Sequence, residues 1–138
     1  MSEPVRGVIV AHADLAAALV HAVESISGVS DALIPLTNRG VPPEELRDRV
    51  ESAVGKGPAI IFCDLGSGSC AFTSRLVARR RPGIAVLSGT NLPMLLDFVF
   101  HREMEVPALV DRLVRKARAE LAVQADSTDL PSGADQPV

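Results

Sequence analysis

A histidine, an aspartate and a run of small residues are the side chains in this sequence with the clearest chemical potential. They are His12, Asp64 and the stretch Ser67-Gly68-Ser69. An imidazole can act as a nucleophile, and a carboxylate on one ring nitrogen leaves the lone pair of the other nitrogen free. Glycines and serines before a helix can bind an anion through backbone amides and hydroxyls. Together these residue types favour phosphoryl transfer through a phosphohistidine.

These residues can meet only if the chain places them at one edge of a sheet. Apolar runs predict strands, and patterns of period 3.6 with caps predict helices. The expected strands span residues 7–11, 32–36, 59–63 and 84–87, and the expected helices span 15–27, 42–54, 70–80, 93–101 and 106–121, with Asp14 and Asn91 as caps. This alternation predicts an α/β fold with an open, mainly parallel sheet and helices on both faces.

Ligands bind such sheets beyond the carboxyl ends of the strands. His12, Asp64 and the turn Ser88–Asn91 follow the first, third and fourth expected strands directly. We therefore expect these polar residues to share one rim of the sheet.

Simpler or different interpretations of the same residues remain open. His12 could be an ordinary polar residue, and Asp64 could only cap the next turn. The stretch Gly66–Ala71 fits the dinucleotide pattern G-x-G-x-x-A, but no acid follows the next strand for a ribose hydroxyl. Cys70 at a helix start could be a thiol nucleophile beside His12. A metal site with Cys63 is disfavoured, since Cys63 and Asp64 are neighbours on a strand and point to opposite faces.

Composition excludes several classes of protein. The chain has 138 residues, of which 47% are hydrophobic, so it can form one domain with a real core. It lacks Trp and Tyr, the platforms on which nucleic-acid bases stack. Three of its 17 acidic residues lie in the last fifteen positions, which leaves residues 1–123 without net charge. We therefore predict a domain at 1–123, a disordered acidic tail at 124–138, and no attraction to nucleic acid.

The apolar segments and the cysteines predict the cellular compartment. The first apolar stretch is too short for a signal peptide, and no run reaches the ~20 residues of a membrane span. Two cysteines need no disulfide in a chain with this core. We expect a reduced, cytoplasmic protein without direct membrane insertion.

Three segments resemble a known family, the IIA components of the mannose-type sugar phosphotransferase system (PTS). The first strand, its histidine and the following helix start are similar to those of the family, and so are a D-L-x-G-G-S loop and a G-x-N-L-P-M-L-L segment. In this sequence they are Gly7–His12 with Leu15-Ala16, Asp64-Leu65 with Gly68-Ser69, and Gly89–Leu96. Their order and spacing agree over about residues 5–121.

The resemblance implies specific roles. His12 would accept the phosphoryl group on Nε2, Asp64 would hold the other ring nitrogen, and Ser67, Gly68 and Ser69 would receive the phosphoryl oxygens. The donor would be the phosphocarrier protein HPr, charged from phosphoenolpyruvate by enzyme I, and the acceptor a IIB component that passes the group to a sugar. A homodimer is implied, and neither a cofactor nor a metal ion is expected.

The sequence departs from the family pattern at three positions. Ala13 and Ser67 stand where glycine is usual, and Cys70 stands where proline is usual. The segment Asp64–Ser67 also resembles the phosphodonor subunit of dihydroxyacetone kinase. A free-standing regulatory module, or a phosphodonor subunit of the dihydroxyacetone-kinase type, that signals through phosphorylation of His12 is therefore the alternative to a role in sugar uptake.

Overall fold

Four short apolar runs form the strands of one parallel sheet. In the computed structural model, which describes residues 3–125, they are β1 (Arg6–Ala11), β2 (Leu33–Thr37), β3 (Ala59–Cys63) and β4 (Ile84–Leu87). The strand order is β2-β1-β3-β4, and every pair is parallel. The central strands β1 and β3 are buried almost throughout, as expected for strands that are covered on both faces.

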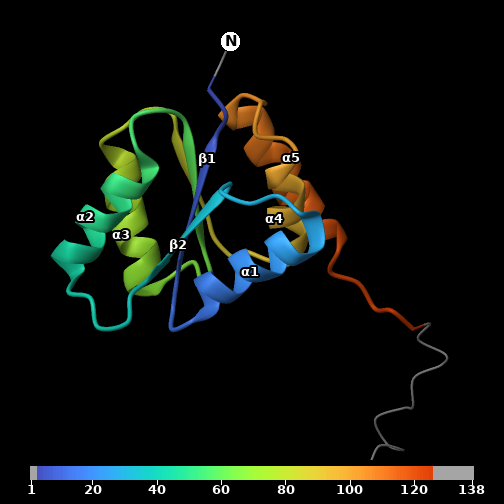
Figure 1. The fold of residues 1–138 in the computed structure, drawn as a ribbon, viewed down its shortest axis with the longest axis horizontal. Helices are drawn as coiled ribbons and strands as arrows, with labels where there is room; N and C mark the ends of the chain where they lie inside the picture. Colours follow the sequence, from blue (N-terminus) through green and yellow to red (C-terminus); the bar gives the residue numbers. More distant parts are fainter. Residues whose placement is uncertain (1–2, 126–138) are drawn as a thin grey trace, which may run out of the picture.

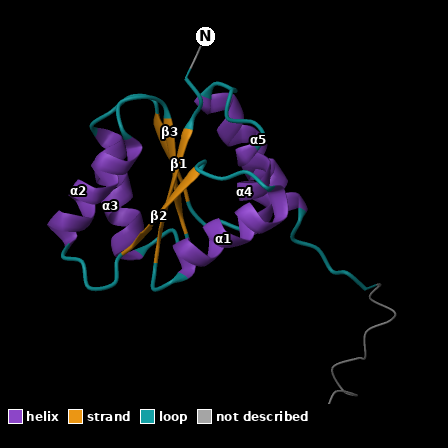
Figure 2. Cartoon of the chain, in the orientation of Figure 1, coloured by secondary structure: helices purple, strands orange, loops and turns teal. Residues whose placement is uncertain are grey.

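Helices cover both faces of this sheet. α1 (Leu15–Ser27), α4 (Leu92–Val99) and α5 (Val106–Ala119) lie on one side, and α2 (Pro43–Val54) and α3 (Gly68–Arg79) lie on the other (Figure 1; Figure 2). Successive residues of β1 alternate between the two cores, since Ile9 packs with Phe62 and Phe98, while Val8 and Val10 pack with the opposite layer. The predicted fold class is confirmed.

Most predicted boundaries agree with the structure within two residues, and one predicted cap is wrong. Asn91 caps α4 as expected, since its side-chain oxygen accepts a hydrogen bond from the Met94 amide at 3.2 Å. Asp14 precedes α1 but makes no capping hydrogen bond. Its carboxylate instead pairs with the Arg39 guanidinium at 2.9 Å, because the loop after β2 passes close to the start of α1.

The strand order places the carboxyl ends of β2, β1 and β3 next to one another. Ala11 is opposite Thr37 of β2, and Val10 is opposite Cys63 of β3. The helices that follow β1 and β3 pack on opposite faces, the arrangement beside which ligands bind in open α/β sheets. The residues after β1, β2 and β3 therefore line a common rim.

The chain beyond α5 is described only in part. Residues 120–125 form no further helix or strand, and the rest of the predicted tail, 126–138, lies outside the described residues. Between residues 3 and 125, none of the helices combines the length and the apolar character that crossing a bilayer requires.

Candidate functional site

His12 and Asp64 form a hydrogen-bonded pair at the rim. Each follows the last residue of a central strand, and the parallel register of β1 and β3 brings them together. His12 Nδ1 lies 2.8 Å from Asp64 Oδ2, and the same oxygen accepts the His12 backbone N–H at 3.0 Å. With a proton on Nδ1, this arrangement leaves the lone pair of Nε2 free. The predicted meeting of the two residues is confirmed.

His12 is the more accessible member of the pair. The Asp64 side chain is 11% exposed, whereas the His12 side chain is 39% exposed. The carboxylate is thus largely shielded and the imidazole still reaches solvent. A reacting group can therefore approach His12 without displacing Asp64.

Hydrogen bonds lower the pKa of Asp64. Burial by itself raises this pKa, but the backbone N–H and the ring of His12, together with the Leu65 N–H, outweigh burial and bring it below the ordinary value of 3.8. The Leu65 N–H donates to Asp64 Oδ1 at 3.0 Å. Both carboxylate oxygens are therefore occupied as acceptors, which favours the ionised form.

This lowered pKa predicts an acid-dependent contribution to stability. A carboxyl group with a depressed folded-state pKa stabilises the fold above its unfolded pKa, and this stabilisation is lost as pH falls through the folded value. Because water screens this partly exposed pair, we expect wild type to exceed Asp64→Asn by only about 1 kcal/mol in free energy of unfolding near neutral pH. Urea titrations should show this difference shrinking between about pH 5 and pH 2. A difference that stays constant over this range would contradict the prediction.

The start of α3 faces the free ring nitrogen. A Cβ atom placed on Gly68 would lie 3.7 Å from His12 Nε2 and 3.8 Å from Cε1, so any side chain at this position would contact the ring beside its free nitrogen. Gly68 has φ +89, a conformation that side chains rarely adopt. Ser67 precedes the helix and its hydroxyl makes no capping hydrogen bond. Unpaired amides at a helix start attract anions.

The end of β2 and the loop after it also reach the rim, although no residue of this segment was predicted there. Asn38 Nδ2 donates to Ser69 Oγ at 3.3 Å, and the Thr37 hydroxyl donates to the Ala13 carbonyl at 2.7 Å. The rule that selected His12 and Asp64 applies equally to the end of β2. Applying it there would have included Thr37.

The turn after β4 has mainly structural roles. Thr90 donates from its hydroxyl to the Cys63 carbonyl at 2.8 Å, and the Asn91 side chain holds α4 and donates to the Ala117 carbonyl at 3.0 Å. Ser88 lies next to the glycine loop, since a Cβ on Gly66 would be 3.3 Å from its hydroxyl oxygen. This turn therefore supports the rim rather than adding a reactive group.

The thiol interpretation of Cys70 is wrong. Cys70 is fully buried, and burial, with the nearby negative charge of Asp64, raises the pKa of its thiol to about 11. A protonated thiol is a poor nucleophile. A position at a helix start favours a low thiol pKa, but for Cys70 the effect of burial is larger.

Cys70, not Cys63, is the cysteine that approaches the histidine pair. Donor atoms of His12, Asp64 and Cys70 lie within 4.8 Å of one another, a nitrogen, oxygen and sulfur set that could hold a metal ion. Binding would require deprotonation of the Cys70 thiol and would compete with both hydrogen bonds to Asp64 Oδ2. We assign no ion to this set.

Comparison with known proteins identifies related sequences and folds. Residues 7–114 match the family EIIA-man, described as the PTS system fructose IIA component. No curated protein matches the sequence.

Three solved structures share the fold. The phosphotransferase system component EIIA from Streptococcus agalactiae has 24% identity and a TM-score of 0.81, covering 86% of this chain and 96% of its own. The mannose/sorbose specific IIA subunit from Enterococcus faecalis has 17% identity and a TM-score of 0.77, covering 94% and 98%. The PTS IIA protein associated with the fucose utilization operon from Streptococcus pneumoniae has 18% identity and a TM-score of 0.74, covering 89% and 96%.

Proposed function

Because the chain belongs to the EIIA-man family of PTS IIA components, we propose that it is a phosphocarrier whose His12 accepts a phosphoryl group from phospho-HPr. The group then passes to a IIB component of a mannose-type sugar system. The observation that carries this proposal is the 2.8 Å contact between His12 Nδ1 and Asp64, which leaves Nε2 facing Gly68.

The proposed transfer needs little beyond positioning. The lone pair of His12 Nε2 attacks phosphorus, a P–N bond forms, and the P–N bond of the donor breaks with its electron pair returning to the donor imidazole. The proton on Nδ1 stays in its hydrogen bond to Asp64, whose negative charge balances the imidazolium-like ring. Because donor and acceptor are both imidazoles, the change in free energy is small and alignment governs the rate.

The residues around Nε2 are suited to the transferred group. We assign Ser67, Gly68 and Ser69 to the phosphoryl oxygens, because they form the start of α3 and Gly68 brings bare backbone next to the nitrogen. The positive end of the helix would stabilise the spreading negative charge.

The rim also suits successive partners. Leu15 and Leu65, close in sequence to His12 and Asp64, are 42% and 55% exposed. Exposed apolar side chains around a reactive atom favour small, transient interfaces. We propose that HPr and the IIB component bind this surface in turn, in the cytoplasm, and that the chain acts as a homodimer.

Labelling with phosphoenolpyruvate, enzyme I and HPr tests the proposal. We expect one phosphoryl group per chain, attached by an acid-labile and base-stable bond, and no label when HPr is omitted. Absence of label in the complete mixture would overturn the proposal.

A chase with a IIB component tests the second step. Transfer of the label from the chain to the IIB component supports the transport role. Retention of the label would instead favour the regulatory alternative, in which phosphorylation of His12 changes the choice of partner.

A further inference from the structure

The residue after His12 has an unfavourable backbone conformation. Ala13 has φ 53, and among the described residues only Asp31 is another non-glycine residue with positive φ. A side chain in this left-handed region costs free energy that glycine does not incur. Such a residue persists only where its surroundings hold it. Since Ala13 adjoins His12, its conformation sets the direction in which the chain leaves the histidine.

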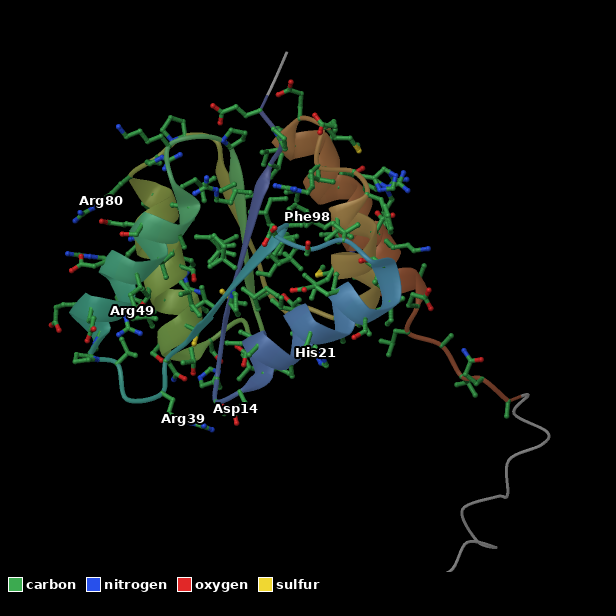
Figure 3. All side chains as sticks on the ribbon, in the orientation of Figure 1. Asp14, His21, Arg39, Arg49, Arg80 and Phe98 are labelled. Atoms are coloured by element: carbon green, nitrogen blue, oxygen red, sulfur yellow. The ribbon has the colours of Figure 1, made fainter. Side chains whose placement is uncertain are left out.

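The last residue of β2 and the loop that follows it supply that hold. The Thr37 hydroxyl donates to the Ala13 carbonyl at 2.7 Å and accepts the backbone N–H of Arg39 at 3.1 Å. The Arg39 guanidinium pairs with the Asp14 carboxylate at 2.9 Å, and Figure 3 shows these two labelled side chains next to each other. The turn after His12 is thus held at two points, the Ala13 carbonyl and the Asp14 carboxylate.

The same loop is attached to the start of α3. Asn38 Nδ2 donates to Ser69 Oγ at 3.3 Å. An amide nitrogen is only a donor, so the Ser69 oxygen must be the acceptor of this hydrogen bond. Asn38 therefore links this loop to the first turn of α3.

We propose that the loop Thr37–Arg39 is a positioning element of the phosphorylation site, in which Thr37 is the principal positioning residue. Its hydroxyl stabilises the left-handed turn at Ala13 and so aims the His12 ring between Asp64 and Gly68. A hydrogen bond from a neighbouring strand thereby replaces the backbone freedom that glycine would give at position 13. This inference rests on the proposed function of His12 and adds residues that determine its alignment.

A double-mutant cycle tests the inference. Thr37→Val keeps the shape of the side chain and removes the hydroxyl, and we expect it to slow labelling by roughly tenfold. Ala13→Gly in the Thr37→Val background should restore most of the rate, because glycine adopts the turn without help. Ala13→Gly alone should change the rate by less than about twofold, since the turn is already held.

Thr37→Ser is the matched control, because it keeps the donor and should retain most of the rate. Equal losses in Thr37→Ser and Thr37→Val would overturn the inference, and so would failure of Ala13→Gly to restore the rate of Thr37→Val. Urea titrations of the same variants separate loss of alignment from loss of folded protein.

A second readout does not depend on phosphoryl transfer. Nitrogen NMR of the His12 ring should show a shifted Nδ1 signal in Thr37→Val, returned towards wild type by Ala13→Gly. If the wild-type protein accepts no label, the proposed function fails, while these ring signals still decide whether Thr37 aligns His12. Ring signals identical in wild type and Thr37→Val would overturn the inference.

Discussion

Alanine in place of His12 is expected to abolish phosphoryl labelling. Without Nε2 no P–N bond can form at position 12, and the nearby Cys70 thiol cannot replace it as a nucleophile, because it is buried with a pKa of about 11. We expect incorporation to fall by at least about 10³-fold. The fold should persist, since Asp64 keeps its hydrogen bonds from the backbone N–H groups of residue 12 and Leu65.

The chain contains two other histidines that serve as matched controls. His21 is exposed on α1, and its replacement by alanine should leave labelling unchanged. His101 lies beyond α4, near Asp97. The two carboxylate oxygens of Asp97 already accept hydrogen bonds from the Arg112 guanidinium, at 2.8 and 3.1 Å. His101→Ala should therefore also retain the label. Substantial labelling of His12→Ala, or its loss in His21→Ala, would contradict the assignment.

The arrangement of strands could be predicted because it follows from local patterns. β3 is an uninterrupted apolar run, and such a run fits a strand that is covered on both faces. Alternation of strands and helices then requires parallel pairing. The cap at Asp14 could not be judged in this way, because Arg39, its actual partner, comes from a loop that is distant in the sequence.

The central pair of the site was predictable for a similar reason. His12 and Asp64 each follow a central strand, and parallel strands end at the same edge, so backbone topology alone brings them together. The protonation of Cys70 was not predictable, since it depends on how tightly α3 packs on the sheet. The contacts of Thr37 and Asn38 depend on the path of one loop, which no periodic pattern encodes.

Asparagine in place of Asp64 is expected to slow phosphoryl transfer strongly while the protein stays folded. Three donors surround the carboxylate: the His12 backbone N–H and Nδ1–H on Oδ2, and the Leu65 N–H on Oδ1. An amide offers one oxygen and one NH₂ group, so it cannot accept all three. If its NH₂ group faces the histidine, Nδ1 becomes the acceptor and the ring proton moves to Nε2, which then has no lone pair for phosphorus. We expect a loss of up to roughly 10⁴-fold, the size known for the same exchange in a serine–histidine–aspartate triad.

The rate of labelling and the tautomer of His12 together decide this prediction. Nitrogen NMR at neutral pH should show the proton on Nδ1 in wild type and a substantial Nε2–H population in Asp64→Asn. Asp64→Glu, which keeps two acceptor oxygens but displaces them, separates charge from position and should lose less of the rate. Wild-type labelling in Asp64→Asn, or an Nε2–H tautomer in the wild-type protein, would contradict a mechanism in which this carboxylate holds Nε2 ready as the nucleophile.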